Sequence, residues 1–353
     1  MHQRDEIVAS AAPLLALSYG KESQGQELMN ASATLVLANH RPETIPLARR
    51  LMAVHDTIIL EEPPDQRFKP MLEGEIAIDT YLEDQELEYP DFSRQMALIL
   101  RECRQAGIGL VQVEPFIDLL LSIHDRFANG EGPQDLPTGN DLHRVYQAER
   151  LATKALIDFY QASGRDNFDT TVDAVKRFAR ADAQRFALRD QMRAEAMVVL
   201  LQEPGKTYIE AGQIHYPLWH ELRRRLPAGF PLRVHFLMTA VVRKLGYRRH
   251  LFGPGDLLTL YYRFHPRGRF QGEDLLAARA LIYNKLILKE EIAAEAGTYP
   301  HTRDELEVGS VTDQLSLDDC RRLYPLVRRA STTDSRKIIN RYIGDRWPVG
   351  RPT

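Results

Sequence analysis

The segment ATLVLANH (33–40) constrains the fold most, because its side chains are apolar on both faces before the run stops at a histidine. Such strands are typical of parallel sheets that helices cover on each side. Residues 42–55 then predict a helix, with Pro42 suited to its first turn. A second apolar run, DTIILEE (56–62), ends at paired glutamates. This order predicts a β-α-β unit with parallel strands and a right-handed crossover.

The same alternation continues along the chain. Residues 91–107 predict a helix with Gly107 at its C-terminal end, and 108–116 predict the next buried strand. A long helical stretch covers about 141–202, interrupted at GRDNFDTT, and a strand at 206–215 follows. The remaining predicted elements are a loop at 129–140, a helix in PLWHELRRRL, a strand at 229–238, and helices from about 273 onward, beginning with EDLLAARALIYNKLILKEEIAAEAG. The sequence therefore predicts an α/β fold, with a mostly parallel sheet covered by helices and a helical C-terminal extension.

The domain organisation follows from these elements. We expect an N-terminal lead-in at 1–32, an α/β domain at 33–240, and a third part at 241–353 packed on the core. This third part combines a segment rich in basic and aromatic residues with the helical extension.

Composition restricts the class of protein. Hydrophobic residues make up 44% and charged residues 27% of the chain, as in ordinary globular proteins. A net charge of −3 argues against a general polyanion binder. Cys103 and Cys320 are the two cysteines, too few and too far apart for a zinc ribbon or a disulfide framework, and Cys103 suits a packed core. Without a signal sequence or a window of ~18–20 apolar residues, we expect a cytoplasmic protein with no membrane span.

Four predicted strands end in side chains that bind protons and metals. These strand-end residues are His40, the pair Glu61 and Glu62, Glu114, and His215. Because ligands bind at the carboxyl ends of parallel strands, we expect these groups to converge on one edge of the sheet. Imidazole and carboxylate groups bind Mn, Zn, Fe or Co and position a metal-bound water as a nucleophile, and without a metal they serve as general acid and base. The alternative is that each residue only marks where a strand leaves the core.

Arg189 extends this set from a helix. Arg189, Met192, Ala196 and Val199 recur at helical spacing, and we expect their shared face to lie on the sheet. Arg189 could then reach the strand ends and hold an anion or carboxylate of a substrate. A salt bridge with a nearby acid is the alternative, and Asp190 is a weaker candidate.

Five motifs occur in order: LANH, ILEEPPDQRFKPMLEGEIAIDTYL, CRQAGIGLVQVEP, RDQMRAEAM and YIEAGQIHY. Together they resemble the Tiki/TraB, erythromycin-esterase and ChaN superfamily, and most closely its ChaN-like, haem-binding branch. The resemblance covers roughly residues 33–225 and none of the C-terminal third. By position it implies site roles for His40, Glu61, Arg189 and His215, and less directly for Glu114.

Two positions depart from the pattern of that superfamily. Leu37 stands where the first motif has glycine, and Glu62 where a methionine is expected. The superfamily includes metal-dependent peptidases, esterases that use His and Glu, and haem-binding proteins, so the resemblance implies a fold more directly than a reaction.

The leading hypothesis is a metal- or His/Glu-assisted hydrolase of an amide or ester. Glu61, Arg189 and His215 would be catalytic, and Arg189 with Glu114 would bind the substrate. A divalent ion (Mn, Zn or Fe) would be bound by His40, Glu61, Glu62 and His215. One alternative is a ChaN-like protein that binds haem or another ligand without turnover. The second is a degenerate member of the family that binds a partner.

Residues 241–270 would supply the partner surface in that last case, because arginines and aromatic residues alternate there. Such a mixture can bind phosphates or single-stranded nucleic acid. It also occurs on helix-loop surfaces that pair with acids elsewhere, and His220 nearby suits a surface or core position. We expect a small-molecule or peptide ligand rather than nucleic acid. The sequence leaves a homo-oligomer open.

Overall fold

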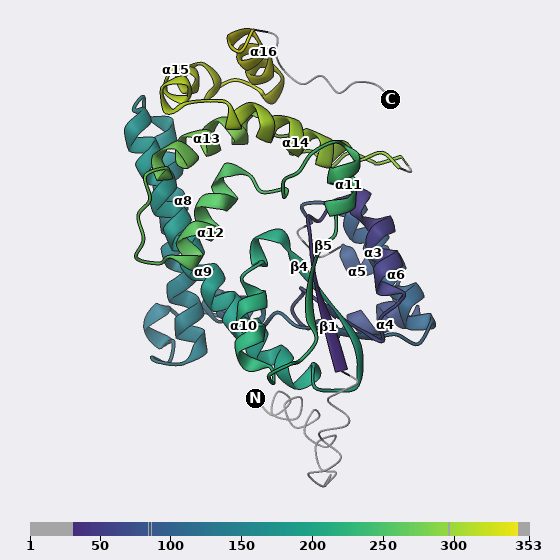
Figure 1. The fold of residues 1–353 in the computed structure, drawn as a ribbon. Coiled ribbons are helices and arrows are strands. Elements are labelled where there is room, and N and C mark those ends of the chain that lie inside the picture. The colour runs from purple at the N-terminus through teal and green to yellow at the C-terminus, as the bar shows by residue number, and fades with distance from the viewer. Residues whose placement is uncertain (1–30, 84, 86, 296, 345–353) are drawn as a thin grey trace.

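A computed structural model describes residues 31–83, 85, 87–295 and 297–344 of the chain (Figure 1). The predicted lead-in at 1–32 lies outside the described residues except for its last two. Within the described part, one five-stranded sheet has the order β3-β2-β4-β1-β5, and every pairing is parallel. The strands are β1 (Ala31–Ala38), β2 (Thr57–Leu60), β3 (Gly109–Gln112), β4 (Gly205–Gly212) and β5 (Leu232–Phe236). The predicted α/β fold is therefore confirmed.

Alternation along the strands gives the sheet two apolar faces. Val36, Leu60 and Tyr208 point to one face, which we call the α6 face. It is covered by α3 (Ile45–Met52), α4 (Phe68–Glu73), α5 (Ile78–Leu82) and α6 (Pro90–Gln105). Leu37 and Ile59 point to the other face, which we call the α9 face. The C-terminal half of α9 (Phe168–Leu200) and α10 (Leu218–Arg225) cover it, on the opposite side of the sheet in Figure 1.

The helical extension is joined to the sheet through α9. Its N-terminal half, from Phe168 to Ala183, belongs to a second core that the C-terminal helices complete. Its C-terminal half, from Ala194 onward, packs on the sheet. The remaining α-helices of the described residues are α7 (Pro115–Ala128), α8 (Asp141–Gly164), α11 (Thr239–Lys244), α12 (Pro254–Phe264), α13 (Glu273–Leu286), α14 (Pro300–Asp313), α15 (Leu317–Val327) and α16 (Thr332–Tyr342).

Three expectations about local structure were wrong. The predicted strand at 108–116 ends at Gln112, because Pro115 starts helix α7. The helix expected through 273–297 ends at Leu286, and the backbone of Ile287 is extended. The face of α9 that lies on the sheet includes Arg193 and Met197, whereas Val199 of the predicted stripe is 57% exposed and Ala196 is also exposed.

The arginines of 241–270 that form contacts pair with acids, as the helix-loop alternative predicts. Arg249 Nη1 lies 2.6 Å from Asp313 Oδ2, and Arg263 Nη2 lies 2.9 Å from Glu221 Oε1. Both cysteines are buried and free, which confirms Cys103 as a core residue. Among the described residues, no helix is both long enough and apolar enough to pass through a membrane.

Candidate active site

The strand-end residues gather at the carboxyl edge of the sheet, but the sheet separates them into two groups. Successive side chains of a strand point to opposite faces, and the two glutamates after β2 continue this alternation. Glu61 follows Ile59 to the α9 face, where its carboxylate contacts α9. Glu62 follows Leu60 to the α6 face. Adjacent glutamates therefore belong to different environments.

His215 is the centre of the group on the α9 face. It lies in a 3-10 turn (Gln213–His215) directly after β4, and its side chain is 3% exposed. Its Nδ1 lies 2.6 Å from Asp190 Oδ1, and its Nε2 lies 2.9 Å from Glu61 Oε1. The Phe186 ring packs edge-on against the imidazole. Both ring nitrogens are thus occupied by carboxylates.

The Glu61 carboxylate accepts hydrogen bonds from several elements of the structure. Its Oε1 also accepts a hydrogen bond from Arg189 Nη2 at 3.0 Å, and its Oε2 accepts one from the Gly212 backbone N–H at 2.6 Å. Arg189 Nε donates to Glu114 Oε2 at 3.0 Å. The Arg189 side chain therefore pairs with acids, which is the alternative that the sequence left open. We call Glu61, Glu114, Arg189, Asp190 and His215 the ion cluster.

Arg193 of α9 forms hydrogen bonds at the carboxyl ends of the same strands. Its guanidinium is fully buried and donates to the carbonyl oxygens of Val113 at 3.0 Å and Glu210 at 2.6 Å. Strand carbonyls that have no partner in the sheet are costly when buried, and this arginine satisfies two of them. The carboxyl ends of β3 and β4 are thereby tied to α9.

Electrostatic interactions within the ion cluster favour the charged forms of His215 and Glu61. Burial alone would lower the pKa of His215, but the charges of Glu61 and Asp190 raise it to about 9. Burial alone would raise the pKa of Glu61, but His215, Arg193 and Arg189 hold it well below its ordinary value. At neutral pH we therefore expect an imidazolium between carboxylates, a group with no free nitrogen for catalysis.

The raised pKa of His215 predicts a pH dependence of stability. A histidine whose pKa is raised in the folded state stabilises that state fully below pH ~6.5 and loses this contribution as pH rises towards 9. We expect the loss in unfolding free energy caused by His215→Gln to be largest at pH 6. It should be smaller by about 3 kcal/mol above pH 9. Urea unfolding of both proteins from pH 6 to 10 measures this, and a pH-independent difference would contradict an imidazolium in the folded state.

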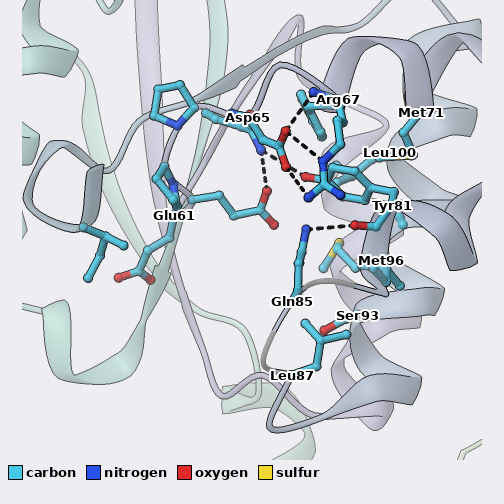
Figure 2. A pocket seen from close by; sticks show the side chains of 18 of the residues that line it. Glu61, Asp65, Arg67, Met71, Tyr81, Gln85, Leu87, Ser93, Met96 and Leu100 are labelled. Carbon is cyan, nitrogen blue, oxygen red and sulfur yellow. Dashed lines mark hydrogen bonds and ion pairs between the residues drawn. The ribbon is translucent and has the colours of Figure 1, made fainter. Parts of the chain in front are cut away.

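A cavity of about 1150 Å³ opens on the α6 face at the carboxyl ends of β1, β2 and β4. Its strand side carries His40, Glu62, Glu210 and, from β3, Gln112. Its helix side is largely apolar. Figure 2 shows Glu61 at the strand side, with Met71, Tyr81, Met96 and Leu100 on helices across the cavity.

His40 is the residue of this cavity with an unused polar atom. Its ring stacks on Phe92 of α6, with centroids 5.2 Å apart and planes 18° apart. Its Nε2 is buried and has no hydrogen-bond partner among the described residues. Buried polar atoms are almost always satisfied, so an orphaned imidazole nitrogen at a cavity wall points to a ligand or a water.

Two carboxyl groups of the cavity hold their protons more tightly than usual. Burial, together with the charge of Glu210, raises the pKa of Glu62 to about 7. Burial also raises the pKa of Glu210, while the charge of His40 lowers it. Gln112 Nε2 donates to Glu62 Oε2 at 2.9 Å and so fixes that carboxyl. Strongly perturbed carboxyl groups in a cavity are candidates for acid-base chemistry.

The structure thus gathers Glu61, Glu114, Arg189 and His215 in one cluster, and places His40 and Glu62 on the other face of the sheet. Sequence reasoning missed Glu210, although a carboxylate between the apolar residues of YIEAG was a usable signal. It also ranked Asp190 too low, and that residue is 0% exposed and binds His215.

The sequence suggests a divalent metal ion or haem as cofactor, and each needs particular ligand side chains. Among the described residues, no three His, Cys, Asp or Glu side chains are arranged to hold a metal ion. His40, Glu61 and Glu62 line the cavity, whereas His215 lies between Glu61 and Asp190 of α9, and metal binding by these four residues stays a prediction. A single free imidazole nitrogen beside apolar side chains, as at His40, fits the requirement for one axial ligand of haem.

Comparison with known proteins gives a distant relative. A protein of Archaeoglobus fulgidus, described as an uncharacterized protein, is 29% identical over 294 residues, which is 82% of this chain and 97% of the relative. This share exceeds what residues 1–240 alone could supply, so the similarity includes part of the helical extension. No protein-family model matches the chain, and no solved structure matches it.

Proposed function

We propose that the protein hydrolyses an ester or amide in the cavity on the α6 face, by acid-base chemistry of His40 and Glu62. The observation that carries this proposal is the buried Nε2 of His40, which has no hydrogen-bond partner among the described residues and belongs to a residue that lines the cavity together with Glu62 and Glu210. The position also fits, because the carboxyl ends of parallel strands are where α/β folds bind substrates.

The proposed reaction uses His40 as the base and Glu62 as the acid. His40 Nε2 accepts a proton from water as the water oxygen adds to the substrate carbonyl. Protonated Glu62 donates its proton to the leaving alkoxide or amine as the bond to the carbonyl carbon breaks. The proton on His40 then returns to Glu62, so that an acid and an alcohol or amine leave and the enzyme is restored.

The ion cluster has a positioning role in this proposal. Glu61 precedes Glu62 in the chain, and its carboxylate is bound by His215, Arg189 and the Gly212 N–H. These bonds fix the backbone on which the Glu62 side chain is mounted. Productive geometry has to be held within about 0.5 Å, which such a rigid support provides. Glu61 also lines the cavity, but its carboxylate oxygens are already bound by these donors, so we assign Glu61, Arg189 and His215 the role of positioning Glu62.

A second candidate function is the binding of haem or a similar ligand without turnover. The Nε2 of His40 favours it, since this atom has no hydrogen-bond partner among the described residues and an axial ligand needs a free imidazole nitrogen. Apolar side chains such as Met96 and Leu100 would cover the macrocycle.

Glu62→Gln tests the acid role. We expect the rate with alkyl esters, whose leaving groups need a proton, to fall by about 10²–10⁴-fold. p-Nitrophenyl esters need little protonation, so their rate should change far less. For the wild type, the rate with alkyl esters should fall as pH rises through about 7, since Glu62 then loses its proton. Equal losses with both leaving groups would contradict this role.

A further inference from the structure

The cavity on the α6 face has a polar end and an apolar end. The polar end consists of His40, Glu62 and Glu210 at the strand ends. Opposite them lies an apolar wall from four helices, which we define as Met71, Tyr81, Met96, Leu100, Ile117 and Leu121. Such a division fits an amphipathic ligand.

Helix α6 supplies the continuous part of this wall. Ser93, Met96 and Leu100 line the cavity at positions i, i+3 and i+7, which lie along one face of a helix. Leu98 of the same helix points away and is 42% exposed. The face of α6 from Ser93 to Leu100 spans two turns of the helix, which is long enough to contact an extended ligand chain.

The wall continues to the rim of the cavity. Leu121 of α7 lines the cavity and is 50% exposed. Large apolar side chains that stay exposed at a cavity rim are typical of ligand sites. An apolar group bound there would cover Leu121 and continue along α6.

The charges of the cavity restrict the ligand further. Glu62 and Glu210 form no ion pair with an arginine or lysine among the described residues. Arg67, which also lines the cavity, is already paired with Asp65, with Nη2 3.1 Å from Oδ2. An anionic ligand would thus meet carboxyl groups at one end, and the described lining residues include no second arginine and no lysine to bind it.

We propose that the cavity accepts an uncharged ester or amide with a long apolar acyl group, and excludes anionic ligands. The carbonyl lies at His40 and Glu62, and the acyl group lies along the apolar wall. This inference rests on the proposed function for the reacting bond, but the ligand class follows from the wall and the charges alone. The carboxylate product would be repelled by Glu210, which favours its release.

Binding of two fluorescent dyes tests the ligand class without turnover. We expect neutral N-phenyl-1-naphthylamine to bind the full-length protein at least tenfold more tightly than anionic 8-anilinonaphthalene-1-sulfonate. Leu121→Glu should weaken binding of the neutral dye by at least tenfold, because it places a charge at the rim. Leu151→Glu is the matched control, since Leu151 is 52% exposed on α8 and does not line the cavity. Ser93→Trp, which places an indole ring in the cavity beside Met96, should also weaken binding.

Hydrolysis of p-nitrophenyl esters from acetate to octanoate gives the second readout. We expect kcat/KM to rise about threefold to fourfold for each added methylene, the gain from burying that group. Equal binding of the two dyes, or equal effects of Leu121→Glu and Leu151→Glu, would overturn the inference. Selective dye binding with no hydrolysis of any ester would overturn the proposed function and leave the ligand class standing.

Discussion

His40→Ala is expected to lower kcat/KM for ester hydrolysis by about 10²–10⁴-fold, the usual contribution of a general base. The unpartnered Nε2 of His40 is the base in the proposed reaction, and alanine leaves nothing to accept the proton of the attacking water. The stacked Phe92 keeps its own place in the α6-face core, so the cavity should persist. Steady-state kinetics with a p-nitrophenyl ester measures the change.

His220→Ala is the matched control for this prediction. His220 is exposed on α10, contacts Trp219 and Phe264, and does not line the cavity, so its removal should leave kcat/KM within about twofold. An equal loss in both variants would contradict a specific role for His40. A Soret band after haem addition that disappears in His40→Ala, without hydrolysis in the wild type, would favour the second candidate function.

The strands were predictable because each one is a short apolar run with a polar end. β1, β2 and β4 lie within one or two residues of the predicted starts. Parallel pairing then follows from the intervening helices, and with it the convergence of the strand ends. Three residues of the ion cluster, Glu61, Glu114 and His215, could be nominated on these grounds from the sequence alone.

The separation of the candidates into two groups was harder to predict. A shift of one residue in a strand moves every side chain to the opposite face, and strand ends are uncertain by one or two residues from sequence. Glu61 and Glu62 are therefore equivalent in the sequence, although the Glu61 carboxylate binds His215 and the Glu62 carboxyl accepts from Gln112. The register of β2 against β3 and β4 decides which of the two glutamates points to which face of the sheet.

The sheet-facing side of α9 escaped prediction for a different reason. Periodicity treats arginine as a surface residue, but Arg193 is fully buried because it caps strand carbonyls. The true face is thus marked by charged residues, Asp190 and Arg193, as well as by Ala194 and Met197. Likewise α4, α5 and α7 form part of the cavity wall, and their short or Pro-initiated sequences gave no strong helical pattern.

Glu61→Gln is expected to lower the free energy of unfolding by about 3–5 kcal/mol, since it removes the anion from a buried set of charges. The Glu61 side chain is 5% exposed and lies between His215 and Arg189, with Arg193 Nη1 3.7 Å away. In Glu61→Gln, Asp190 and Glu114 would be the remaining carboxylate partners of His215 and Arg189. Urea unfolding at pH 7 measures the loss. Glu62→Gln should cost less than about 1 kcal/mol, because its carboxyl is half-protonated and faces the cavity; equal costs at the two positions would refute the separation of their roles.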